Sequence, residues 1–154
     1  SRDRTRGGTT MRNQPTIGHD DAADAIEAIR AELAVRRLAA VIAVVDAAGE
    51  LMAFLRTDGA PVSSVGVAMS KARTAARLRR ATRVLGESIR TRDIDIAYYA
   101  DAGLTGFAGG LPVWHGREVV GAVAVSGLSE AEDEELAALG IARMRSPGLA
   151  SSAG

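Results

Sequence analysis

The sequence lacks cysteine, has few aromatic residues and carries no excess charge of either sign. The absence of cysteine excludes disulfide bonds, thiolate metal ligands and a cysteine nucleophile. Aromatic residues make up 3% of the chain, which argues against a base-stacking platform or a large aromatic cage. The 19 basic and 19 acidic residues cancel, so neither nucleic acid nor an anionic membrane is an expected partner.

Long hydrophobic runs are also missing. The longest, residues 38–45, is far shorter than the roughly 20 residues that a membrane-spanning helix needs. The first 14 residues are basic and polar, and no apolar segment follows them, which is unlike a secretory signal. We therefore expect no membrane partner and a cytoplasmic location.

What remains is the composition of one globular domain. The chain has 154 residues, of which 47% are hydrophobic and 25% charged, a balance typical of a chain that buries its own core. We expect this domain over residues 19–145. Flexible tails are expected over residues 1–18 and 146–154, which are polar or rich in serine and glycine.

Hydrophobic periodicity predicts an alternation of helices and hairpins. Helices are expected over 21–36, from Ser63 or Ser64 onward, near 82–90, and over 129–143. Strands are expected over 41–45, 51–55, 111–114 and 118–125. The order helix, hairpin, helix, hairpin, helix predicts an α+β domain in which helices flank an antiparallel sheet.

Several single residues refine this prediction. Asp20 or Asp21 is expected to cap the first helix, and Ser129 with Glu132 matches a capping box for the last one. Gly121, inside a strand, predicts a close backbone approach or a bulge. The second helix carries a stripe of small apolar residues that would let it lie close to the sheet: Val65, Ala68, Ala72 and Ala75.

Three segments together resemble the GlcG/HbpS-type family, which also occurs as the C-terminal domain of PduO-type proteins. The first reads VIAVVDAAGEL over residues 41–51 and continues to RTDGA over residues 56–60. The second is AMSKARTA, residues 68–75. The third begins with GGLP at residue 109, continues through VVGAVAVSG at residues 119–127 and ends at Asp133 and Ala137. The three segments fall within residues 20–142, which is nearly the whole domain.

The resemblance implies a profilin-like or PAS-like fold and a homo-oligomer. It also implies a small-molecule ligand, with haem or another tetrapyrrole as the default, although other family members have enzymatic roles. Fold is therefore better predicted than function. The sequence departs from the family pattern at Ala124, where glycine is more common, and the extra methyl group would narrow a pocket lined by that strand.

Lys71 is the only lysine in the chain. A compact ammonium group could hold an anion, or act as an amine base if desolvated. The alternative is a structural pair with a carboxylate such as Asp46 or Asp58. We expect a ligand pocket beside the second helix, and the residues expected to bind the ligand there are Arg56, Lys71, Thr74, Gly109, Gly110 and Pro112.

The second functional hypothesis is a small enzyme acting on an anionic or carbonyl-bearing metabolite. Lys71, Asp58 and His115 would supply acid–base groups and Arg56 would bind the anion. The alternatives are a turn or salt bridge for Arg56 and Asp58, and an ordinary exposed histidine at 115.

Other possible motifs give weaker indications of function. The two histidines, His19 and His115, make no zinc motif, so we expect no metal site. The glycines from 103 to 110 do not form a nucleotide-binding fingerprint. A basic cluster could bind nucleic acid, but the favoured interpretation is a solvated helix face or a contact between subunits that pairs with the acidic run 130–135. The cluster comprises Arg73, Arg77, Arg79, Arg80 and Arg83.

Overall fold

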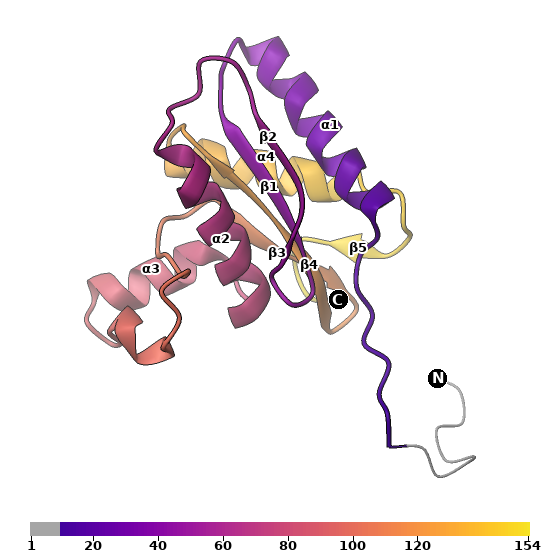
Figure 1. The fold of residues 1–154 in the computed structure, drawn as a ribbon, viewed down its shortest axis with the longest axis vertical. Helices are drawn as coiled ribbons and strands as arrows, with labels where there is room; N and C mark the ends of the chain where they lie inside the picture. Colours follow the sequence, from indigo (N-terminus) through magenta and orange to yellow (C-terminus); the bar gives the residue numbers. More distant parts are fainter. Residues whose placement is uncertain (1–9) are drawn as a thin grey trace.

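The computed structural model describes residues 10–154 and contains four α-helices, one 3₁₀ helix and five strands (Figure 1). The helices are α1 (His19–Arg36), α2 (Ser64–Leu78), α3 (Thr82–Arg90) and α4 (Glu130–Ala142), with the 3₁₀ helix η1 at Ile96–Tyr99. The strands are β1 (Val41–Asp46), β2 (Leu51–Arg56), β3 (Gly110–His115), β4 (Glu118–Ser126) and β5 (Leu149–Ala150). The predicted α+β class is confirmed.

The strands form one antiparallel sheet in the order β2-β1-β4-β3-β5. Helices cover both faces, and the side chains of β1 alternate between them as a strand requires. Val41, Ala43 and Val45 pack in the cluster that includes α2. Ile42 and Val44 pack in the larger cluster that includes α1 and α4. β1 is therefore an interior strand that is buried from Val41 to Val45, as its β-branched run predicts.

The small-residue stripe of α2 is confirmed. Ala68, Ala72 and Ala75 are completely buried and pack against Ala122 and Ala124 of β4. Because methyl groups line both sides of this contact, helix and sheet approach closely. Ala124 is completely buried in it, so the extra methyl group noted in the sequence fills the helix–sheet contact.

The single-residue predictions had different outcomes. The capping box of Ser129 and Glu132 is present. Gly121 does lie in a close approach, because a Cβ there would be 2.7 Å from the Val45 carbonyl oxygen. The expected cap of α1 is wrong, since the helix begins at His19 with Gly18 as its N-cap. Asp21 instead accepts hydrogen bonds from the backbone N–H and hydroxyl of Ser146, at 2.8 and 2.6 Å.

Both segments expected to be tails contribute to the folded domain where the structure describes them. The backbone N–H of Ile17 donates to the Val120 carbonyl oxygen at 2.9 Å, and the Ile17 side chain belongs to the core. At the other end, β5 pairs with Trp114 and His115 of β3. The remainder of the expected N-terminal tail, residues 1–9, lies outside the described residues.

Candidate functional site

Lys71 lies on the inner face of α2 and is buried, with 3% of its side chain exposed. Its Nζ donates to Asp133 Oδ2 at 3.0 Å and to the Val125 carbonyl oxygen at 2.9 Å. The other carboxylate oxygen of Asp133 accepts from the Leu128 backbone N–H at 3.2 Å. Burial raises the pKa of the Asp133 carboxyl, and the neighbouring Lys71 ammonium opposes that rise.

The expected structural pair for Lys71 therefore exists, but its partner is Asp133 rather than Asp46 or Asp58. Gly109 and Gly110 lie against the same helix, as predicted. A Cβ at Gly109 would be 2.7 Å from Lys71 Nζ, and one at Gly110 would be 2.5 Å from the Lys71 carbonyl oxygen. The glycines thus make room for the ion pair, which ties α2, β4 and α4 together in the interior.

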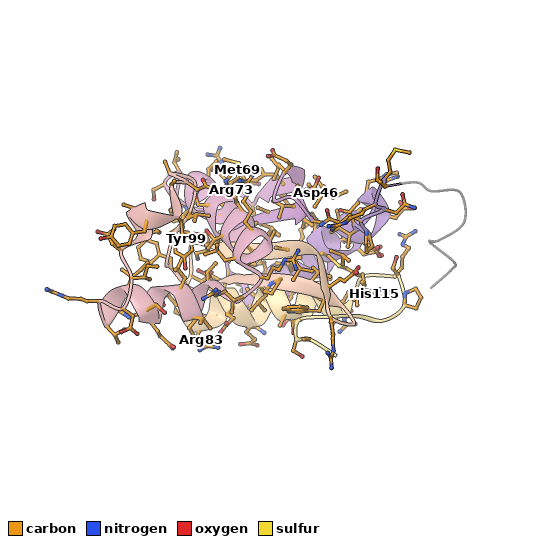
Figure 2. The ribbon with its side chains drawn as sticks, turned by 90° about the horizontal axis from the view of Figure 1, so that it is seen from below. Asp46, Met69, Arg73, Arg83, Tyr99 and His115 are labelled. Atoms are coloured by element: carbon orange, nitrogen blue, oxygen red, sulfur yellow. The ribbon has the colours of Figure 1, made fainter. Side chains whose placement is uncertain are left out.

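The remaining predicted residues do not join Lys71 around one cavity. Arg56 and Asp58 are exposed and line a separate pocket, of about 320 Å³, with Arg30 and Leu38. Pro112 is buried within β3, and His115 is exposed at the tip of the β3–β4 hairpin, far from α2 (Figure 2). The structure therefore does not assemble the enzyme that the sequence suggested from these residues.

Thr74 has a structural role in the next loop. Its hydroxyl donates to the Ser70 carbonyl oxygen at 2.7 Å and accepts from the Thr105 backbone N–H at 3.0 Å. It thereby fixes the segment after η1 against α2. The same loop also packs closely against α3. Gly86 of α3 and Gly106 of the loop are so close that a Cβ at Gly86 would be 2.2 Å from the Gly106 carbonyl oxygen.

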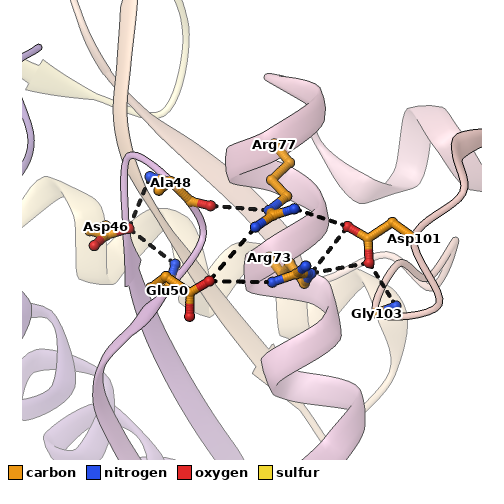
Figure 3. Close-up of polar contacts among 7 residues, drawn as sticks. All are labelled: Asp46, Ala48, Glu50, Arg73, Arg77, Asp101 and Gly103. Carbon is orange, nitrogen blue, oxygen red and sulfur yellow. Dashed lines mark hydrogen bonds and ion pairs between the residues drawn. The ribbon is translucent and has the colours of Figure 1, made fainter.

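The outer face of α2 carries a pocket of about 430 Å³, which we call the arginine pocket. It is lined by Glu50, Leu51, Met69, Ser70, Arg73 and Asp101, together with Val45 and three glycines. Figure 3 shows its ion pairs, and Figure 2 shows Met69 and Arg73 along α2. The charged groups come from three places, namely the β1–β2 turn, α2 and the loop after η1.

Asp101 holds the two arginines from one side. Arg73 Nε donates to both carboxylate oxygens at 3.2 Å, and Arg77 Nη1 donates to Oδ2 at 3.3 Å. The Gly103 backbone N–H also donates to Oδ1, at 2.9 Å. The hydrogen bond from Gly103, with the nearby arginines, lowers the pKa of Asp101, although partial burial opposes the effect.

This lowered pKa has a consequence at acid pH. A carboxyl whose pKa is lower in the folded state stabilises the fold above its unfolded pKa of about 3.9, and that contribution is lost as the pH falls through the folded value. In a carbon-13 NMR titration, Asp101 should therefore titrate below about pH 3.9. The variant Arg73→Gln should raise this midpoint, whereas the surface change Arg117→Gln should leave it unchanged.

A second pocket, of about 450 Å³, lies between α3 and the loop after η1, and we call it the apolar pocket. Its walls are mainly Ile89, Ile96, Leu104 and Phe107, and 56% of Phe107 is exposed. Arg90 and Glu130 stand at its edge. Within residues 10–154, neither of these two charged side chains has an ion-pair partner.

Sequence reasoning missed both pockets. Arg73 and Arg77 were noticed only as part of a basic cluster, and their partners Glu50 and Asp101 come from distant turns. Within that cluster, Arg83 Nε lies 3.4 Å from Glu134 of the acidic run, which is a pair within one chain and not the contact between subunits that was considered for these residues. The available signal for the apolar pocket was the presence of large hydrophobic residues, Leu104 and Phe107, in a glycine-rich loop.

Two further properties of residues 10–154 bear on other functions. No helix in this part of the chain is long and apolar enough to cross a membrane. No group of three histidine, aspartate or glutamate side chains there is arranged to hold a metal ion.

These features define a single α+β domain with two solvent-accessible pockets beside α2 and α3. The chain belongs to the HbpS-like family, described as haem degrading protein HbpS-like, whose model matches residues 17–142. It is 33% identical over 117 residues to an uncharacterized 15.0 kDa protein in the dhaT-dhaS intergenic region of Citrobacter freundii. That match covers 75% of this chain and 80% of the relative.

Solved structures show the same fold. A double mutant of Streptomyces reticuli HbpS is 27% identical and superimposes with a TM-score of 0.79, covering 92% of this chain and 95% of that one. The PduOC:heme complex has a TM-score of 0.79, at 22% identity, and the match covers 88% of this chain and 98% of that one. At this lower identity the second likeness shows the fold alone.

Proposed function

We propose that this protein is a small-molecule binding domain whose ligand is haem or another tetrapyrrole, held in the apolar pocket. The description of its family names haem, and PduOC, which has the same fold, has been solved as a haem complex. The observation that carries the proposal is one pocket that combines an apolar wall with a guanidinium group free of carboxylate partners among residues 10–154.

The lining residues fit the chemistry of such a ligand. A tetrapyrrole is a flat apolar ring with acidic substituents, so Ile89, Leu104 and Phe107 would contact the ring. Arg90 would bind a carboxylate by a charge-assisted hydrogen bond. No histidine, cysteine or methionine lines this pocket, and Glu130 is the lining carboxylate that could ligate a metal. Haem, when bound, supplies an iron centre for redox chemistry.

The absence of nitrogen and sulfur ligands gives a specific expectation. Because ring burial and Arg90 supply most of the affinity, metal-free protoporphyrin IX should bind within about tenfold of haemin, a difference of roughly 1.4 kcal/mol. Haemin is titrated by its Soret absorbance and protoporphyrin IX by its fluorescence. Absence of a spectral change with either compound at micromolar protein would contradict the proposal.

Variants with matched controls locate the site. Arg90→Gln and Phe107→Ser should each weaken binding by about tenfold or more, since one removes a charge-assisted hydrogen bond and the other removes apolar contact. Arg117→Gln and Tyr98→Ser replace an arginine and an aromatic residue at positions that do not line the pocket. Equal losses in the controls would show that the ligand binds elsewhere.

A further inference from the structure

We infer that the arginine pocket is a second site, specific for small carboxylates, in which the side chain of Glu50 occupies the position of the ligand's carboxylate. This pocket shares no lining residue with the apolar pocket, so the inference stands independently of the proposed function. It rests on how two arginines of α2 are held, Arg73 in the lining of the pocket and Arg77 one turn further along the helix, and on what faces their free edges (Figure 3).

The inner edges of both guanidinium groups are bound to well-placed acceptors. Asp101, only 17% exposed, accepts from Arg73 and from Arg77 at 3.2 and 3.3 Å. Arg77 Nε also donates to the Ala48 carbonyl oxygen at 3.1 Å. These contacts fix the two side chains before any ligand arrives, which reduces the entropy lost on binding.

The outer edges are held much less well. Arg73 Nη1 and Arg77 Nη2 both point toward Glu50 Oε1, and each lies 3.7 Å from it. Those distances exceed the range of about 2.7–3.2 Å for an N–H···O hydrogen bond. Glu50 is also 68% exposed, so its carboxylate is readily solvated when displaced. Two donors therefore converge on one oxygen position that is only loosely occupied.

The backbone of Glu50 is fixed although its side chain is not. Asp46 Oδ1 accepts from the backbone N–H groups of Ala48 and Glu50, at 2.9 and 3.0 Å. Displacement of the carboxylate therefore requires only rotation of the Glu50 side chain, while the turn stays in place. Once it has moved away, the outer edges of the two guanidinium groups are free to donate to the carboxylate of a ligand.

The rest of the pocket limits the size and character of the ligand. Val45, Leu51 and Met69 supply apolar contacts and Ser70 contributes its polar side chain. A carboxylate on a short apolar body fits this lining. The planar arginine forks suit two carboxylate oxygens.

The experiment is a calorimetric titration of the full chain with succinate, at constant ionic strength maintained with chloride. Glu50→Gln removes the internal competitor and should tighten succinate binding several-fold. Arg77→Gln removes one of the converging donors and should weaken it by about tenfold or more. Glu118→Gln, which removes an exposed negative charge at the β3–β4 hairpin, should leave the affinity close to that of the original chain.

The opposite signs of the first two variants are the diagnostic result. If Glu50 only stabilised the arginines, Glu50→Gln would lower stability and would not tighten binding. The inference is overturned if neither the original chain nor Glu50→Gln binds succinate at millimolar concentrations, or if Glu50→Gln weakens binding. Stronger binding of inorganic phosphate than of succinate would overturn the assigned carboxylate class. Haemin titrations of the same variants report on the apolar pocket separately.

Discussion

Replacing Lys71 by methionine is expected to lower the free energy of unfolding by about 3–5 kcal/mol. The substitution leaves the Asp133 carboxylate, which is 3% exposed, without its cationic partner in the interior. A buried charge without compensation is far more costly than a well-packed apolar group in the same place. Urea denaturation monitored by circular dichroism measures the change directly.

The double variant Lys71→Met with Asp133→Leu distinguishes the contribution of the ion pair to stability from the contribution of packing. Because both charges are removed together, most of the lost stability should return. The exposed pair of Arg30 and Glu27 offers a surface control, and Arg30→Met should change stability little. A Lys71→Met variant as stable as the original chain would contradict the structural role of this pair.

Replacing Gly109 by alanine should be almost as damaging, lowering the free energy of unfolding by about 4 kcal/mol from backbone strain and overpacking together. Gly109 has a φ of +129°, a conformation that residues other than glycine rarely adopt. The new Cβ would also lie 2.6 Å from the Val125 carbonyl oxygen and 2.8 Å from Asp133 Cβ. Neither neighbour is the end of a flexible side chain, so the backbone itself must move.

Gly116 provides the matched control for this variant. Its φ is also positive, at +63°, but a Cβ there would meet nothing within 4 Å. Gly116→Ala should therefore cost only the strain of the left-handed conformation, about 1 kcal/mol. Equal destabilisation by the two substitutions in thermal or urea denaturation would contradict the crowding at Gly109.

The fold was predictable because its signals are local. The β-branched run of β1, the alanine stripe of α2 and the capping box at Ser129 each depend on residues a few positions apart. Local signals mislead where a distant partner competes. Asp21 looked like a helix cap, but Ser146, 125 residues away, donates two hydrogen bonds to it.

The sites were harder to predict because their residues come from distant turns. The structural pair that was considered for Lys71 is present, yet its partner Asp133 is 62 positions away and was not among the carboxylates considered. The arginine pocket needs Glu50, Arg73 and Asp101 from three elements. The family resemblance identified the fold and pointed to haem, but the positions of both pockets follow from how the loop after η1 packs.

That loop borders both pockets, so the two sites proposed above depend on the position of the same stretch of backbone. Asp101 and Gly103 line the arginine pocket, while Leu104 and Phe107, immediately after them, line the apolar one. Thr105, which also lines the apolar pocket, donates its backbone N–H to the Thr74 hydroxyl and so fastens the loop to α2. If a ligand in one cavity displaced this loop, the affinity of the other cavity would change as well, and thermodynamic reciprocity would make the two effects equal in size.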